Sequence, residues 1–271
     1  MIRSRRALVL PGVAAIAVLV VLAAAGKQSF GPASSTGSIA IAAASDLQFA
    51  VGELVDAYEA DHPGVELTAT FGSSGNFVSQ IRNGAPFDVF FSADLAFPRA
   101  LEADGLAATG STRRYATGRL VLWVPPGSTL DVVGHGLDAL ADPTVKRIAI
   151  ANPEHAPYGR AAVAALRSAG LEDVVADRLV LGENVSQAAQ FVESGAADAG
   201  IVARSLVLAP TLRGVGTHVD VPAELHPPIE QGAVVLARAA DPAAATAFLD
   251  FVLSPAGRAV LGRSGFDAAG G

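Results

Sequence analysis

Short apolar runs and amphipathic segments alternate along the chain. From residue 38 to residue 92, runs of strand length are separated by segments whose apolar residues recur every three or four positions. In the first such segment, Leu47, Val51, Leu54 and Tyr58 lie on one face of a helix. The alternation predicts a parallel sheet with right-handed helical crossovers. The predicted strands are 38–44, 65–71 and 88–92, and the predicted helices are the segment from Leu47 and 76–82.

The same rhythm continues through the second half of the chain and predicts a second lobe. Its expected strands are 119–124, 147–151, 178–181 and 199–202, with helices at 159–169 and 185–194. A strand at 231–236 is expected to return to the first lobe, before closing helices at 243–253 and 255–261. We therefore predict an α/β fold with mixed, mostly parallel sheets in two lobes joined by two crossover strands. Lobe one comprises 38–117 and 228–271, and lobe two comprises 118–227.

The N-terminal segment differs from the rest of the chain. Three arginines within the first six residues precede an apolar run that reaches Ala25. This pattern is typical of a signal peptide, and the alanines before Gly26 fit a cleavage site. The run also approaches the roughly 20 residues that span a bilayer, so an uncleaved anchor is the alternative. We predict export, with a signal or anchor segment at 1–25 and a Gly-, Ser- and Pro-rich tether at 26–37.

The composition supports a folded protein and narrows its partners. The chain has 271 residues, of which 51% are hydrophobic and 17% charged, so apolar material suffices for two lobes. Its formal net charge of -7 argues against nucleic acid or an anionic membrane surface as the main partner. The absence of cysteine excludes disulfides, thiolate metal sites and a cysteine nucleophile. The five histidines show no metal-ligand spacing, and we expect no cofactor.

Two serines stand where a predicted strand ends and a helix begins. Ser45 follows three alanines at the end of the first strand, and Ser74 follows the second strand. Such a junction offers a hydroxyl and free backbone N–H groups at the positive end of a helix dipole. Ligands of parallel sheets bind beyond the carboxyl ends of the strands, where both serines fall. The alternative for each serine is an ordinary helix N-cap.

The second lobe offers matching donors. Tyr158 opens a helix after a strand-end loop, so its hydroxyl can point into a cleft between the lobes. Val185 begins another helix, where its N–H has no partner within the helix. The alternatives are a half-buried rim tyrosine and an ordinary helix-start valine.

This donor-rich set favours one class of ligand. A doubly charged tetrahedral oxyanion carries no proton at neutral pH and needs donors only, whereas phosphate is partly protonated and gains from an acceptor. Asp46, beside Ser45, is the one awkward group. Turned into the cleft, its carboxylate would repel a dianion, so we expect Asp46 to cap its own helix instead.

The order of several short motifs resembles the molybdate-binding proteins of bacterial ABC importers, from about Ile39 to Phe266. Together the motifs are specific, although each alone is weak. They are AAAS at 42–45, FGSSG at 71–75, GAPFDVFFSAD at 84–94, NPEHAPYG at 152–159, GENV at 182–185 and GIV at 200–202.

The resemblance implies a type II periplasmic-binding fold that closes on molybdate or tungstate and docks on a membrane permease. It implies ligand roles for Ser45, Ser74, Tyr158 and Val185, and Asp46 completes the candidate site. By this resemblance, molybdenum is present only as the central atom of the bound oxyanion. The oxyanion is held by hydrogen bonds from Ser45, Ser74, Tyr158 and Val185. Some relatives carry a ligand-contacting tyrosine where this chain has Ala203; we expect Tyr158 to supply that hydroxyl.

We therefore expect an exported, monomeric binding protein, in the periplasm or at the outer face of the cytoplasmic membrane, with no catalytic residues. Three alternatives belong to other classes of ligand or protein. The first is a binder of another oxyanion such as sulfate. The second is a hydrolase using Ser45 or Ser74, with His155 as its base and Glu154 beside it. The third is a regulator's sensor domain.

Overall fold

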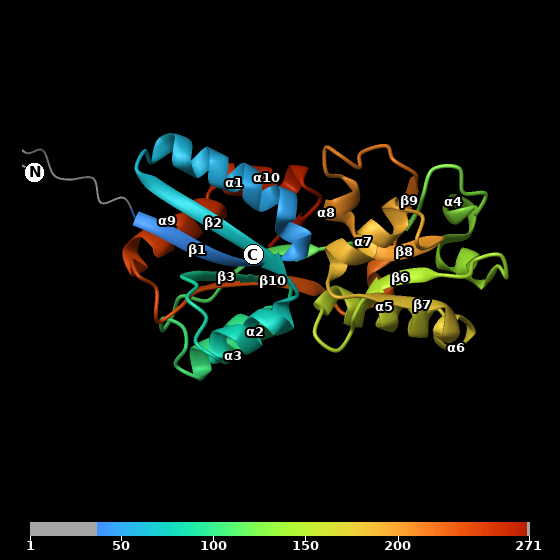
Figure 1. The fold of residues 1–271 in the computed structure, drawn as a ribbon, viewed down its shortest axis with the longest axis horizontal. Helices are drawn as coiled ribbons and strands as arrows, with labels where there is room; N and C mark the ends of the chain where they lie inside the picture. The colour runs from blue at the N-terminus through green and yellow to red at the C-terminus, as the bar shows by residue number, and fades with distance from the viewer. Residues whose placement is uncertain (1–36, 270–271) are drawn as a thin grey trace, which may run out of the picture. The chain divides into compact units, whose positions relative to one another are not determined.

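The computed structural model describes residues 37–269. The predicted signal or anchor segment at 1–25 lies outside the described residues, as does the tether at 26–37 apart from its last residue. The described chain forms two lobes, each built on one sheet (Figure 1).

Lobe one contains a six-stranded sheet in the order β11-β4-β10-β3-β1-β2. Strand β1 pairs in parallel with β2 and β3, whereas β10 runs antiparallel to β3 and β4. The bounds are β1 Gly37–Ala44, β2 Val65–Gly72, β3 Val89–Ser92, β4 Arg113–Gly118, β10 Ile229–Val235 and β11 Asp267–Ala268. The strand predicted to return to this lobe is therefore confirmed as β10.

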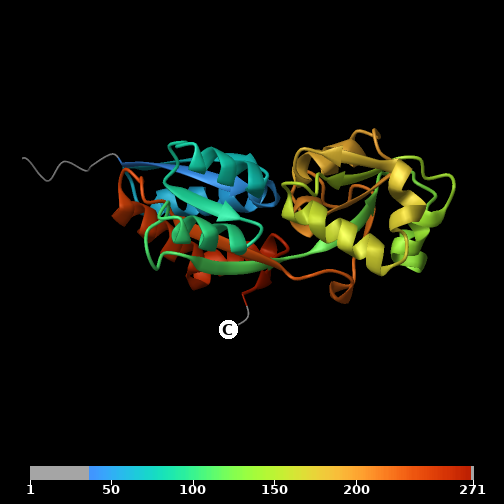
Figure 2. The same ribbon diagram turned by 90° about the horizontal axis from the view of Figure 1, so that it is seen from below.

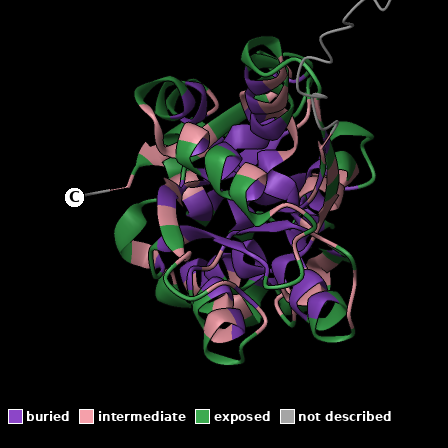
Figure 3. Cartoon of the chain, turned by 90° about the vertical axis from the view of Figure 1, so that its left-hand side faces the viewer, coloured by how far each residue is buried: buried purple, intermediate pink, exposed green. Residues whose placement is uncertain are grey.

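Alternation along the strands divides the core of lobe one into two layers. Ala42 and Phe90 face one side of the sheet, while their neighbours Ala43 and Phe91 face the other. Helices α2 (Ser74–Arg82) and α3 (Ala96–Ala103) pack on the first side. Helices α1 (Gln48–Asp61), α9 (Pro242–Leu253) and α10 (Pro255–Arg263) pack on the second. Buried strands occupy the centre and exposed positions lie on the outer helix faces (Figure 3).

Lobe two contains a five-stranded sheet in the order β7-β6-β8-β5-β9. Its strands are β5 Leu120–Val124, β6 Ile148–Ala151, β7 Leu179–Gly182, β8 Ala199–Ala203 and β9 Thr217–Asp220. Its helices are α4 Val132–His135, α5 Pro157–Ser168, α6 Glu172–Val175, α7 Val185–Glu193 and α8 Arg204–Val207. Every residue of β5 is buried, and the indole N–H of Trp123 donates to the Val215 carbonyl at 2.8 Å.

Two segments cross between the lobes (Figure 2). One is the nearly continuous run from β4 into β5, and the other leads from β9 into β10. Both sheets are mixed, as predicted, but antiparallel pairs form a larger share than the expected mostly parallel sheets. The difference comes from β4 and β9, which the hydrophobic pattern did not predict because their sequences, RRYATG and THVD, lack an apolar run.

Among residues 37–269, no single helix has the length and apolar character needed to cross a bilayer. Helices α9 and α10 meet that criterion only when taken together, and the pair is bent by 61°.

Candidate functional site

One small cavity between the lobes brings together the five candidate ligand residues. Its volume is only about 10 Å³, because the two walls lie close together. From lobe one it is bounded by the chain after β1, β2 and β3, and from lobe two by the starts of α5 and α7. Its lining comprises Ala44, Ser45, Asp46, Gly72, Ser73, Ser74, Ala93, Ala156, Pro157, Tyr158, Asn184 and Val185. The carboxyl ends of parallel strands thus converge on the cavity, as expected for such sheets.

The two serine hydroxyls are oriented by backbone donors. The Oγ of Ser45 accepts a hydrogen bond from the Ser186 N–H at 3.3 Å, and the Oγ of Ser74 accepts from the Ala93 N–H at 3.0 Å. Neither serine caps its own helix, so the N-cap alternative does not describe them. Neither hydroxyl donates to an acceptor among the described residues, so each proton remains available for donation to a ligand.

Free backbone donors line the opposite wall. Two N–H groups at the start of α7 already have acceptors. The Gln187 N–H donates to the Asn184 side chain, and the Ser186 N–H donates to Ser45 Oγ. Within the described chain, the N–H groups of Val185 and Tyr158 have no protein acceptor. Both are first-turn groups, which a helix leaves unsatisfied. They are therefore available to an anion in the cavity.

The Tyr158 hydroxyl lies toward the crossover strands. Gln231 of β10 donates from Nε2 to the Tyr158 oxygen at 3.3 Å and to Asp46 Oδ2 at 2.8 Å. The Tyr115 hydroxyl donates to Gln231 Oε1 at 2.7 Å, which fixes the orientation of the amide. A Cβ at Gly118 would lie 2.2 Å from the Tyr158 oxygen, so only glycine leaves room for this ring. Sequence reasoning read Gln231 as an ordinary strand residue and missed this role.

The expectation that Asp46 caps its own helix is wrong. No side chain caps the 3₁₀ turn η1 (Ser45–Leu47) or the start of α1, and the Asp46 side chain points inward to Gln231. Asp46 is 1% exposed, and burial raises its pKa to about 6, although the Tyr158 hydroxyl and Gln231 offset part of the effect. Burial and the Asp46 charge in turn raise the pKa of Tyr158. The hydrogen bond from the Gln231 amide offsets part of the cost of burying this carboxylate.

His155 joins the lobes at the edge of the cavity. Its carbonyl accepts from the Gly75 N–H at 2.9 Å, and its Nδ1 lies 2.9 Å from Ser73 Oγ. Its Nε2 lies 3.7 Å from the Glu183 carboxylate, which also binds Asn76. His155 therefore contacts Ser73, not the two serines considered as nucleophiles, and its contacts connect lobe one to lobe two.

Comparison with known proteins identifies the family. The sequence profile of the bacterial extracellular solute-binding proteins matches residues 39–267. The chain belongs to this family. Relatives of this solute-binding protein include the molybdate-binding protein ModA of Azotobacter vinelandii, which is 37% identical over 86% of this chain and 91% of its own. The corresponding protein of Rhodobacter capsulatus is 38% identical over 75% of this chain and 78% of its own.

Solved structures agree on the fold of this solute-binding protein. The periplasmic molybdate-binding protein of Azotobacter vinelandii matches with a TM-score of 0.80 and 34% identity, covering 86% of this chain and all of that one. The sulfate-binding protein SubI of Mycobacterium tuberculosis matches with a TM-score of 0.72 and 17% identity, covering 86% of this chain and 87% of that one. At this identity the match shows a similar fold and nothing more. The expected periplasmic-binding fold is thus confirmed. The relatives are binding proteins of transport systems, not enzymes.

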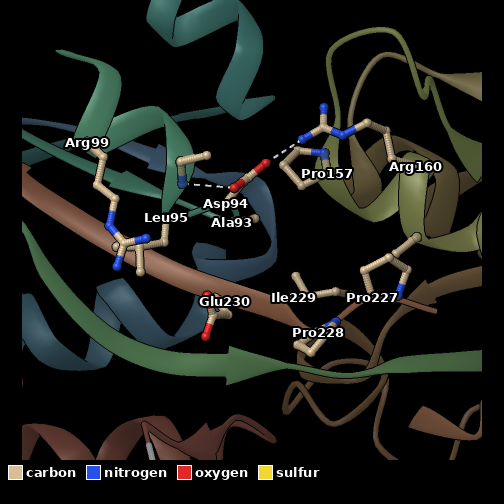
Figure 4. A pocket seen from close by; sticks show the side chains of 12 residues that line it. Ala93, Asp94, Leu95, Arg99, Pro157, Arg160, Pro227, Pro228, Ile229 and Glu230 are labelled. Carbon is tan, nitrogen blue, oxygen red and sulfur yellow. Dashed lines mark hydrogen bonds and ion pairs between the residues drawn. The ribbon is translucent and has the colours of Figure 1, made fainter. Parts of the chain in front are cut away.

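A larger cavity of about 390 Å³ adjoins the first and shares Ala93 and Pro157 with it. Figure 4 shows the Asp94–Arg160 ion pair, 2.7 Å long, that joins the lobes beside this cavity. The Arg160 guanidinium also lies 5.5 Å from the centre of the Phe97 ring. Within residues 37–269, no three histidine or acidic side chains are grouped to hold a metal ion.

Proposed function

We propose that this protein captures molybdate in the cavity between its lobes through uncharged donors and delivers it to the permease of an ABC importer. The observation that carries the proposal is the convergence of oriented donors in one small cavity between the lobes. The hydroxyls of Ser45 and Ser74 face it from lobe one, and the N–H groups of Tyr158 and Val185 face it from lobe two. No lysine or arginine is among the residues that line it.

This chemistry suits an anion without protons. First-turn N–H groups can only donate, the hydroxyl protons of Ser45 and Ser74 have no acceptor among the described residues, and two helix dipoles add positive potential. A charge-assisted hydrogen bond contributes about 1.5–3 kcal/mol. Five or six such bonds reach nanomolar affinity, about -12 kcal/mol, after the cost of closure. Tungstate has the same charge and nearly the same size, so we propose that it binds as well.

Relatives described as molybdate-binding, at 37–38% identity, support this choice of anion. We propose the Tyr158 hydroxyl as a fifth donor, in place of the tyrosine that some relatives carry at the position of Ala203; its proton, which faces Asp46 in the free protein, would turn to the anion on binding. As a member of an extracellular family the protein is exported. We propose that it acts as a monomer in the periplasm or at the outer face of the cytoplasmic membrane, without a resident cofactor.

Calorimetric titration with molybdate, tungstate, sulfate and phosphate tests the proposal. We expect tight binding of molybdate and tungstate, and weaker binding of the other two. Ser45→Ala and Ser74→Ala should each weaken molybdate binding about 10- to 100-fold, because each removes one charge-assisted donor, without lowering the melting temperature of the free protein by more than a few degrees. Tight sulfate binding with no response to molybdate would overturn the assignment.

A further inference from the structure

A carboxylate stands among the donors of the proposed anion site. Asp46 lines the same cavity as Ser45, and its side chain is almost fully buried. One oxygen, Oδ2, accepts from Gln231, whereas Oδ1 has no hydrogen-bond partner among the described residues. The proposed dianion site therefore contains an ionisable carboxyl group, and one of its two oxygens makes no hydrogen bond to the described residues.

Among residues 37–269, no cation pairs with the Asp46 carboxylate or shifts its pKa. Arg204 belongs to α8, which packs against η1, but its guanidinium binds Asp267 at 2.8 Å and Asp220 at 3.5 Å. The neighbouring Ser205 hydroxyl donates to the Asp46 carbonyl, not to its carboxylate. From α5 and β4, Tyr158 and Tyr115 face the group, and both have a pKa raised by burial and by the Asp46 charge.

The other elements packed on η1 bring no charge to Asp46. Helix α1 has no ionisable residue before Glu53, and α7 has none before Glu193 in its last turn. Strand β2 carries Glu66 at the end remote from the cavity. On β10, Glu230 pairs with Arg114 at 3.1 Å. Within the described part of the chain, the carboxylate is thus compensated by neutral donors alone.

Granting the proposed function, we infer that Asp46 takes up one proton from the solvent when the oxyanion binds. A carboxylate that is 1% exposed and a dianion in the same small cavity repel each other strongly, because little water screens a buried charge. A carboxylic acid removes that repulsion, and its O–H on Oδ1 becomes a further donor to the anion while Oδ2 keeps its bond from Gln231. The one bond formed is this O–H, and the anion remains fully deprotonated.

Proton uptake makes capture depend on pH in a defined direction. With a pKa of about 6 in the free protein, Asp46 is ionised above that pH and must be protonated on binding. The affinity for molybdate should then fall up to tenfold per pH unit between about pH 6.5 and 8, and level off below pH 6. Molybdate itself keeps its double charge over this range.

Titration calorimetry of the full protein with molybdate at pH 7.5, in two buffers of different ionisation enthalpy, measures the uptake directly. We expect close to one proton bound per anion. In Asp46→Asn, whose amide oxygen can still accept from Gln231, we expect no uptake, an affinity independent of pH, and tighter binding than the wild type at pH 8.

His155 is the control, because it is a second ionisable side chain at the edge of the cavity, beside Ser73 and the Glu183 carboxylate. If Asp46 causes the pH dependence, the molybdate affinity of His155→Gln should change with pH as steeply as that of the wild type. Wild-type binding without proton uptake, or the same slope in Asp46→Asn, would overturn the inference while leaving molybdate capture intact. Absence of molybdate binding at every pH, in the wild type and in Asp46→Asn alike, would instead overturn the proposed function.

Discussion

At the scale of single residues, the site depends on side chains whose hydrogen-bonding capacity is partly used before a ligand arrives. The hydroxyl oxygens of Ser45 and Ser74 each accept a hydrogen bond from a backbone N–H. The side-chain amide of Gln231 donates one hydrogen bond to Asp46 and one to Tyr158. What remains in the cavity is mainly donor capacity. Asp46 is the exception, and its buried carboxylate carries a cost in the free protein.

That cost gives a prediction about stability. The pKa of Asp46 is raised from 3.8 to about 6, so the folded protein holds this proton more tightly than the unfolded chain. Folding stability should therefore fall as the pH rises from about 4 to 6, by about 3 kcal/mol from this residue, and stay reduced above pH 6. Asp46→Asn should raise the free energy of unfolding in urea at pH 7 and lose that advantage near pH 4. Equal stability of both proteins at pH 7 would show that the carboxylate is not desolvated.

At the scale of elements, the start of α2 acts as a close-fitting contact between lobes. The Gly75 N–H donates to the His155 carbonyl, and a Cβ at Gly75 would lie 2.7 Å from that oxygen and 3.0 Å from the His155 Cα. The contact is with backbone, which cannot move aside as a flexible side chain can. Closure of the lobes thus requires glycine at this position, although the helix itself would prefer alanine.

Gly75→Ala should therefore separate binding from stability. We expect molybdate affinity to fall at least tenfold because the lobes cannot close fully, while the free protein is unchanged or more stable by about 0.5–1 kcal/mol. Gly52→Ala is the matched control: Gly52 lies within α1, and nothing is within 4 Å of its Cβ position. Titration calorimetry and urea unfolding measure both quantities. Unchanged affinity in Gly75→Ala would contradict the role of this contact.

At the scale of the whole described domain, two crossovers and a small set of polar contacts connect the lobes. The Asp94–Arg160 ion pair is among these contacts, beside the larger cavity (Figure 4). Its side chains are 33% and 40% exposed, so water screens the pair and its contribution is about 0–1 kcal/mol. The ion pair therefore contributes little to the free energy that holds the two lobes together.

Arg160→Gln should weaken molybdate binding by no more than about fivefold, mainly through faster release, and the difference from the wild type should shrink at high salt. Arg82→Gln is the control, because the exposed Arg82–Asp104 pair lies entirely within lobe one. Stopped-flow release measured at low and high salt distinguishes the two. A loss of a hundredfold or more in Arg160→Gln would mean that the pair is essential for closure.

The sequence by itself determined the order of most strands and helices and the strand-to-helix junctions that carry Ser45 and Ser74. It could do so because burial on a sheet or helix leaves a periodic trace in neighbouring residues. The ligand roles of these residues stay a prediction. Only the tertiary structure decided that Asp46 turns inward and that Gln231 holds it, since these residues lie 185 positions apart. Local patterns record whether a residue is buried, but its partners depend on how distant segments pack.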